Sequence, residues 1–495
     1  MIFSRRTRIF TTLLVLAGAT GLIVLARHAP PIREVSDGAI LEIYTLEALK
    51  GKLLLGPYSR FGWHHPGPLY FYLEAPWYWL SGGATAGMQA GALAINLAAV
   101  AAIAWVFTRC ASAPSAIGVS CAVGLYALRS GSDFLVSAWN PHVIILPMLA
   151  FVTMAAALAA TGRRGLLFWL VAIGSFLVQT HLALTPIVVV LGATAVVAGR
   201  RSLRGVWTTA GALAFALWLP PLIEQLRHSP GNMTAIAAFF GSNSSPGQPV
   251  MTAVGAWAAA LTSVLRPDFI VAWGFDVLPP RSSAPLVLAI MQVIALACTA
   301  AWARRRNAFA LWLSMMCLTA TCVSLLATTR IRDQIVDHEI FWMSALGALN
   351  AGVIAGVLAA AASGALRPRV LIGRAATSTV CVAAVVVVAA VGLMGMRHAL
   401  QRTRTTDDHS VDVVADEIER HMADAHARRP MIHIEAAVWP IAAGALLRID
   451  KENVRFAVDD RWKTMFGEGF VASGREDLSL TIAGSPFQPR VSVGR

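Results

Sequence analysis

The chain contains many long runs of apolar residues, and these runs limit the folds that it can adopt. The hydrocarbon layer of a bilayer is about 30 Å thick, which takes roughly 20 residues of helix to cross. Charged residues make up only 14% of the 495 positions, and the mean hydropathy is +0.63. The sequence therefore predicts an all-α polytopic membrane protein with about eleven transmembrane helices. The expected spans are 9–26, 88–107, 116–128, 143–160, two arms within 165–199, 206–222, 284–303, 308–327, 340–361 and 377–396.

The positions of the basic residues predict the orientation in the membrane. Arginines precede the first run and close later ones in short clusters, as cytoplasmic loops require. The N-terminus is therefore expected in the cytoplasm, and an odd number of spans places the C-terminal part outside. In a bacterium this means the inner (plasma) membrane, with the C-terminal domain in the periplasm. The net charge of +13 thus indicates the lipid bilayer as a partner and no nucleic acid. The six cysteines show no paired spacing, so neither a disulfide framework nor a zinc site is predicted.

Two segments do not fit single spans. As one helix, 165–199 would be about 52 Å long, so it must fold back, and Gln179, Thr180 and His181 mark the expected bend. The segment 223–283 is predicted to be an external loop with a surface or re-entrant helix. A hidden pair of spans is the alternative there.

The last hundred or so residues change in character. A charged, helix-like stretch at 410–427 is followed by a strand-like stretch at 431–435, a helix at 439–447 and further strands at 454–458 and 478–482. This pattern predicts a small soluble α/β domain. We therefore expect two domains: a transmembrane domain, 1–396, which includes a first external loop at 27–87, and an external domain, 397–495.

The stretch 36–80 is too polar to span a bilayer and contains most of the candidate chemistry. Asp37 and Glu42 lie just past the first apolar run, and a helix-like run begins at Ala39. A proline-rich turn separates this run from an aromatic segment before the second span. The candidate functional residues here are Asp37, Glu42, Arg60, His64, His65 and Tyr70.

These features resemble the GT-C membrane glycosyltransferases, in the branch of protein O-mannosyltransferases and lipid A aminoarabinose transferases. The match consists of S-D-G at Asp37, L-E-I at Glu42, and H-P-G-P-L-Y, which begins at His65. The resemblance implies a sugar donor linked to polyprenyl phosphate, with Asp37 at the position of the catalytic acid and Glu42 at the next acidic position. Gly38 stands where many members have a second acid, so either Asp37 or Glu42 remains open as the general base.

Each of these residues also has a simpler interpretation. Asp37 suits the N-cap of the helix that follows it. His64 and His65 are candidates to bind phosphate, but adjacent side chains rarely face one ion, so a divalent metal is only an alternative and no cofactor is predicted. Tyr70 and its aromatic neighbours suit the headgroup level of a membrane, with sugar stacking as the less favoured alternative.

Further polar residues stand at the predicted outer ends of later spans, where such groups usually line a cavity. Asn140 and His142 precede the fourth span, and Gln179 and His181 lie at the expected bend. The loop before the tenth span contains Arg330 and Arg332, whose guanidinium groups suit a donor phosphate. A surface ion pair of these arginines with Asp333 or Asp337 is the alternative.

The sequence therefore predicts a hexosyl- or pentosyltransferase that moves a sugar from a polyprenyl-phosphate donor to a glycan, lipid or protein acceptor of the cell envelope. A lipid-linked glycan transporter or flippase is one alternative, but it would place polar residues in mid-helix. An O-antigen ligase or polymerase is another, and it would concentrate its basic residues in a large late loop. Here the signal is concentrated in the first loop.

Overall fold

The computed structural model describes residues 5–242, 247–274, 283–363 and 371–494. The chain divides into two compact units, one formed by Met1–Ala92 with Met396–Arg495 and the other by Leu93–Gly395. The loop at 27–87 thus belongs to the same unit as the C-terminal residues.

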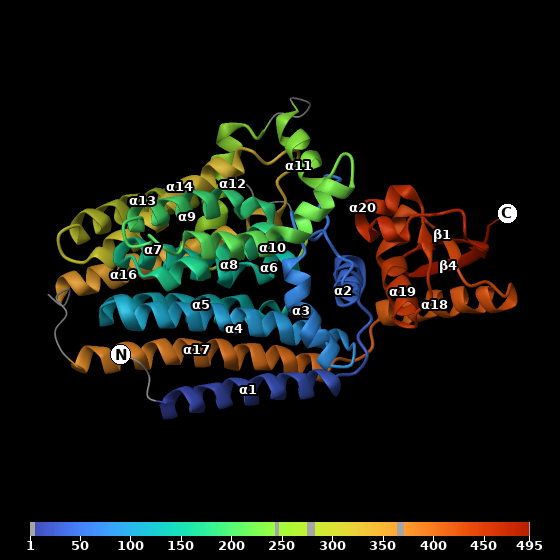
Figure 1. Cartoon of the computed structure of the whole chain (residues 1–495), viewed down its shortest axis with the longest axis horizontal. Helices are drawn as coiled ribbons and strands as arrows, with labels where there is room; N and C mark the ends of the chain where they lie inside the picture. Colours follow the sequence, from blue (N-terminus) through green and yellow to red (C-terminus); the bar gives the residue numbers. More distant parts are fainter. Residues whose placement is uncertain (1–4, 243–246, 275–282, 364–370, 495) are drawn as a thin grey trace. The chain divides into compact units, whose positions relative to one another are not determined.

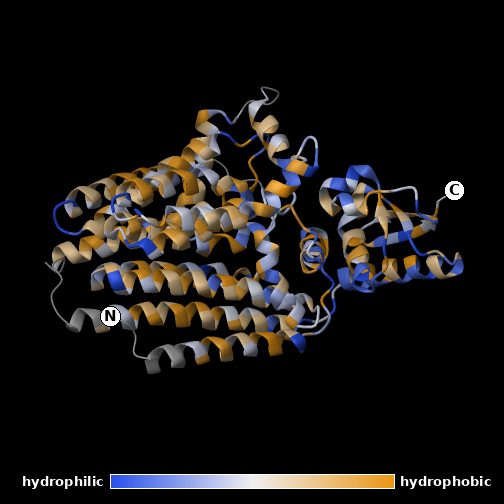
Figure 2. Ribbon diagram, in the orientation of Figure 1, coloured by the Kyte–Doolittle hydropathy of each residue, from blue (hydrophilic) through white to orange (hydrophobic). Residues whose placement is uncertain are grey.

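Each predicted span corresponds to one helix of the structure (Figure 1). Seven helical segments among the described residues are long and apolar enough to cross a membrane, and Figure 2 shows that apolar residues dominate the long helices. The polytopic all-α architecture is therefore confirmed. The helices are α1 (Arg5–Arg27), α4 (Thr85–Cys110), α5 (Ala113–Val136), α7 (Ile145–Thr161), α8 (Arg164–Thr180), α9 (Thr185–Gly199), α10 (Trp207–Arg227), α13 (Ser283–Ala303), α14 (Ala308–Thr328), α16 (Trp342–Ala362) and α17 (Leu371–Leu400).

Small residues let two helices of the second unit pack closely. A Cβ built on Gly118 of α5 would lie 2.4 Å from the carbonyl oxygen of Gly352 in α16. A Cβ on Gly356 would meet the Ser115 backbone at 2.7 Å. Side chains at these positions would push α5 and α16 apart, which is how small residues act at helix interfaces in membranes.

The expected bend after Gln179 is confirmed. Helix α8 ends at Thr180, His181 is extended, and the short turn η1 (Leu182–Leu184) leads into α9. In the segment 223–283, the described residues form two short helices, α11 (Asn232–Gly241) and α12 (Val250–Thr262). Neither is long enough for a full span. The external position of this segment stays a prediction, and residues 243–246 and 275–282 lie outside the described residues.

In the first unit, the C-terminal residues form the predicted α/β structure. Its sheet has the order β2-β1-β3-β4, with β1 parallel to β2 and β3, and β4 antiparallel to β3. The strand β4 was not predicted; it forms a hairpin with β3. The elements are α18 (Thr406–Asp424), β1 (Pro430–Ile434), α19 (Trp439–Lys451), β2 (Ala457–Val458), α20 (Lys463–Phe466), β3 (Leu478–Ser485) and β4 (Gln488–Val493).

The first loop contains two helices, α2 (Ser36–Leu49) and α3 (Leu69–Leu80). Helix α2 packs against both α3 and α19. Consecutive residues from Ala39 to Thr45 are buried, because neighbours cover this helix on more than one side. The start predicted at Ala39 is wrong by about one turn, since α2 begins at Ser36.

Candidate functional site

A small hairpin in the first loop faces one side of α2. Tyr58 and His64 form an antiparallel bridge, so their side chains point to the same face of the hairpin. Asp37 and Tyr44 are seven residues apart in α2, two helical turns, and therefore share one face. The Tyr58 hydroxyl donates a hydrogen bond to Asp37, and His64 Nε2 lies 3.1 Å from the Tyr44 hydroxyl. Gly62, with a φ of 83°, supplies the turn of the hairpin.

Asp37 lies in the first turn of α2, where the helix dipole favours a carboxylate. The N-cap position is occupied by Val35, so the prediction that Asp37 caps the helix is wrong by two residues. Burial, followed by the charge of Asp37, raises the pKa of the Tyr58 phenol. Tyr58 is therefore protonated, and its hydroxyl donates a hydrogen bond to Asp37, which is only partly buried.

Glu42 has a very different environment. Its side chain is fully buried and accepts hydrogen bonds from the Tyr78 hydroxyl at 2.8 Å and the Thr85 hydroxyl at 2.9 Å. Lys451, at the end of α19, forms an ion pair with the same carboxylate. A buried charge is tolerated when it is paired and hydrogen-bonded in this way. No local sequence pattern indicated this partner, because Lys451 lies in the C-terminal domain, far from Glu42 along the chain.

The other first-loop candidates are mostly buried. Burial lowers the pKa of His64 to about 4, so its ring is neutral at physiological pH. His65 is buried with its ring edge-on to Trp63, 5.7 Å between centroids. Tyr70 is fully buried and packs beside Phe71, which leaves no open face for a sugar to stack on.

Arg60 is exposed and lies over the Phe61 ring at 4.6 Å. Among the residues that the structure describes, no group of three His, Cys, Asp or Glu side chains is placed to hold a metal ion.

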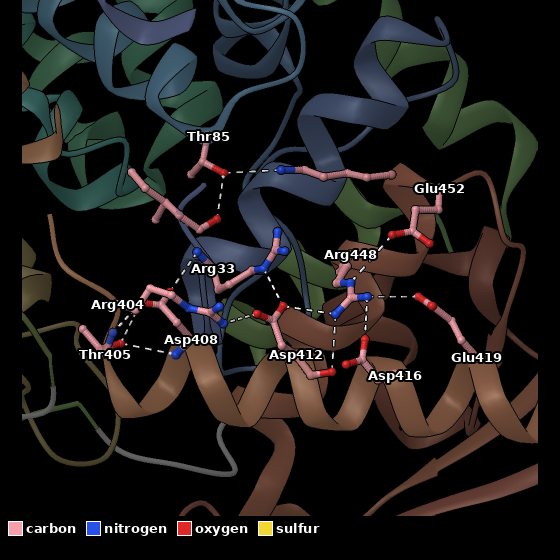
Figure 3. A network of polar contacts seen from close by, with 12 residues as sticks. Arg33, Thr85, Arg404, Thr405, Asp408, Asp412, Asp416, Glu419, Arg448 and Glu452 are labelled. Carbon is pink, nitrogen blue, oxygen red and sulfur yellow. Dashed lines mark hydrogen bonds and ion pairs between the residues drawn. The ribbon is translucent and has the colours of Figure 1, made fainter. Parts of the chain in front are cut away.

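A network of charged side chains joins the first loop to α18 and α19 (Figure 3). Asp412 of α18 accepts from Arg33 Nε at 2.7 Å and from Arg448 Nη1 at 3.1 Å, and it also pairs with Arg404. Arg448 also forms an ion pair with Asp416, with 2.6 Å between Nη2 and Oδ1. The acids of α18 recur every four residues at 408, 412 and 416, and this one-sided stripe was the sequence signal that could have revealed the network.

Glu34 lies between this network and the start of α2. A Cβ built on Gly38 would be 2.5 Å from Glu34 Oε2, so a larger residue at position 38 would make the Glu34 carboxyl group shift. Burial, and then the charge of Glu42, raises the pKa of Glu34 to about 7, although Arg402 and Lys451 oppose the shift. Glu34 was not among the predicted residues.

In the second unit, the structure brings several predicted residues together. His142 is fully buried; its Nε2 donates to the Ala272 carbonyl at 2.6 Å, and its Nδ1 lies 2.9 Å from the Ser137 hydroxyl. Both ring nitrogens are therefore used in holding the chain. The Trp139 ring contacts both His142, at 5.0 Å, and His338, at 5.2 Å between centroids.

The residues at the bend of α8 also form hydrogen bonds to the backbone. Asn140 donates to the Thr180 carbonyl at 3.3 Å, and Gln179 donates to the Leu217 carbonyl at 2.9 Å. His181 is buried at the same turn. The Asn140 contact joins α6 (Asn140–Val143), which precedes α7, to the end of α8. The Gln179 contact joins α8 to α10.

Arg332 and Arg330 differ sharply. Arg330 is exposed, whereas only 8% of Arg332 is exposed. Arg332 donates to the hydroxyl and carbonyl oxygens of Ser242 at 3.0 and 2.6 Å and lies over the Phe239 ring at 4.5 Å. Within the described residues no carboxylate forms an ion pair with Arg332, so the surface-pair interpretation is wrong for this residue.

The chain is similar to the crystal structure of ArnT from Cupriavidus metallidurans bound to undecaprenyl phosphate. The alignment has a TM-score of 0.49 and 12% sequence identity, and it covers 96% of this chain and 93% of that chain. No protein-family model matches the chain, and no curated protein gives a significant match.

Proposed function

We propose that this membrane protein transfers a sugar from a polyprenyl-phosphate donor to a hydroxyl group of a cell-envelope acceptor on the external face. The observation that carries the proposal is the contrast between the two acids of α2. Glu42 is fully buried and neutralised by Lys451, whereas Asp37 is partly exposed and held by a tyrosine hydroxyl. Asp37 is therefore the better general base, since a base must reach the proton that it removes.

The transfer step follows from this assignment. The acceptor oxygen attacks the anomeric carbon of the sugar, and the bond from that carbon to the phosphate oxygen breaks. The proton of the acceptor hydroxyl goes to Asp37, and the electron pair of the broken bond leaves with the polyprenyl phosphate. The hydrogen bond from the Tyr58 hydroxyl orients the Asp37 carboxylate for this role.

Arg332 is our candidate for the donor phosphate. A guanidinium keeps its charge when buried, and a phosphate is the kind of bidentate anion that it binds well. Its described hydrogen bonds are to the hydroxyl and carbonyl oxygens of Ser242, neither of which carries a negative charge. A bound phosphate would place a negative charge against this guanidinium group.

The transporter alternative predicts polar residues in mid-helix. Asn350 of α16 is such a residue, but it donates to Gln292 at 3.2 Å and to Thr321 at 3.0 Å, both on neighbouring helices. Hydrogen bonds of this kind hold membrane helices together. They support packing of the bundle and give no reason to prefer a transport pathway.

The test is a comparison of the cell envelope with and without the gene. Mass spectrometry of lipids, glycans and glycoproteins from the deletion strain should show the loss of one sugar from one acceptor. The wild-type gene should restore that mass, and a gene encoding Asp37→Asn should not. Identical envelope masses in the deletion and wild-type strains would refute a transferase.

A further inference from the structure

Lys451 extends from the C-terminal domain into the first loop. It is the last residue of α19, and its Nζ lies 5.7 Å from the centre of the Tyr78 ring. The ammonium group ends at the Glu42 carboxylate and lies 3.3 Å from the Thr85 hydroxyl, which is 366 residues away in sequence. One side chain of the C-terminal domain thus completes a polar cluster whose other members come from α2, α3 and the start of α4.

The two partners of this ion pair are not equivalent. The Glu42 side chain has no exposed area, while that of Lys451 is 26% exposed. Without Lys451, the buried Glu42 carboxylate would keep only two hydroxyl donors and no counter-charge, which is costly. Without Glu42, Lys451 can turn its flexible stem and ammonium group toward water. Removing the lysine should therefore do more harm than removing the glutamate charge.

Several other contacts hold α2 and the residues before it against the C-terminal domain. A Cβ built on Gly444 would lie 2.4 Å from the Glu34 carbonyl oxygen, so the two backbones are in direct contact. Asp450 lies 3.6 Å from Lys50, just after α2. The Tyr44 hydroxyl donates to the Met465 carbonyl at 2.8 Å. Helix α2 is therefore fixed at its start, middle and end by the C-terminal domain.

We propose that Lys451 is a positioning residue of the transferase site: it pairs with the buried Glu42 carboxylate and so holds α2, with Asp37 in its first turn, in the orientation needed for transfer. The catalytic part of this proposal rests on the proposed function. It assigns the C-terminal domain a part in assembling the site, because the first loop by itself supplies no cation to Glu42 among the described residues.

The experiment uses the full-length protein with four variants: Lys451→Met, Glu42→Gln, the double variant, and Lys451→Arg. Lys463→Met is the matched control, because Lys463 lies in the same domain but pairs with Glu468 at an exposed position, where its side chain is 45% exposed. The kcat and KM of sugar transfer and the thermal unfolding temperature in detergent are measured for each.

Lys451→Met should lower kcat by roughly tenfold to a hundredfold with little change in donor KM, because a small misplacement of a reacting group has effects of this size. The double variant should recover most of that loss and approach Glu42→Gln, since it no longer buries an unpaired charge. Lys451→Arg and the control should stay within about threefold of wild type.

Two results would overturn the proposal: wild-type kcat for Lys451→Met, or a double variant that is no better than Lys451→Met. The unfolding measurement separates this proposal from the proposed function. If the wild type transfers no sugar, the proposed function fails. The contribution of the Lys451–Glu42 ion pair is then tested by the thermal unfolding temperatures alone. In that case Lys451→Met must unfold at a lower temperature than the double variant, and the reverse order would refute the role of Lys451.

Discussion

Asp37→Asn is the substitution that tests the proposed chemistry most directly. The change keeps the size of the side chain and its place in the first turn of α2. The amide oxygen of Asn can still accept the hydrogen bond from the Tyr58 hydroxyl. What it removes is the negative charge and the ability to take up a proton.

The expected effects on catalysis and on stability differ in size. Loss of a positioned general base costs roughly 10²–10⁴ in rate, which is about 3–5 kcal/mol of barrier. Loss of a carboxylate at a helix start costs about 0.3–1 kcal/mol, because the favourable interaction with the helix dipole is lost. The variant should therefore fold nearly as well as wild type and be almost inactive.

The assay has two measurements. Single-turnover transfer from the polyprenyl-phosphate donor gives the rate of the chemical step, and thermal unfolding of the same preparation gives stability. Glu47→Gln is the control, since Glu47 lies in the same helix and pairs with Lys50 at 2.8 Å near the surface. We expect the control to keep at least half of the wild-type rate.

The opposite result would reassign the base. An active Asp37→Asn enzyme beside an inactive but folded Glu42→Gln enzyme would make Glu42 the base despite its burial. Full activity in both variants would exclude the first loop from catalysis.

Four further predictions concern other parts of the chain. Arg332→Lys should raise the donor KM about tenfold even though charge is kept, because the planar fork that binds phosphate is lost; an unchanged KM would remove Arg332 from the donor site. Glu34 has a folded-state pKa of about 7, above its ordinary 4.5, so the folded protein holds this proton longer than the unfolded chain and stability should fall as pH rises from about 4.5 to 7. Unfolding measured across that range should show a smaller decline in Glu34→Gln, and equal slopes would contradict the assignment. Asp412→Asn should lower the free energy of unfolding by about 1–3 kcal/mol, because Asp412 is partly buried among three arginines, whereas the exposed Asp407→Asn should change it little. A reporter fused after Met396 should read as external, and a cytoplasmic reading would contradict the predicted orientation.

The sequence alone determined the membrane architecture, because the information is local. A run of apolar residues long enough to cross the bilayer must form a helix there, whatever surrounds it. The same argument located the bend after Gln179, since one helix of that length would not fit the membrane. The sequence also indicated the α/β pattern of the C-terminal residues, although the strand β4 was missed. Gln488–Val493 is mostly exposed and contains Pro489, a residue type that is disfavoured in strands.

Only the tertiary structure decided which role each candidate residue is suited to. Asp37 and Glu42 are near each other in the sequence, but the sequence could not show that Asp37 is partly exposed. Nor could it show that Glu42 is fully buried and paired with Lys451. It could not separate Arg330 from Arg332 either, although only the second is buried. The physical reason is the same in both cases: burial and the choice of an ionic partner depend on which distant segments pack together, and no local pattern of residues encodes that choice.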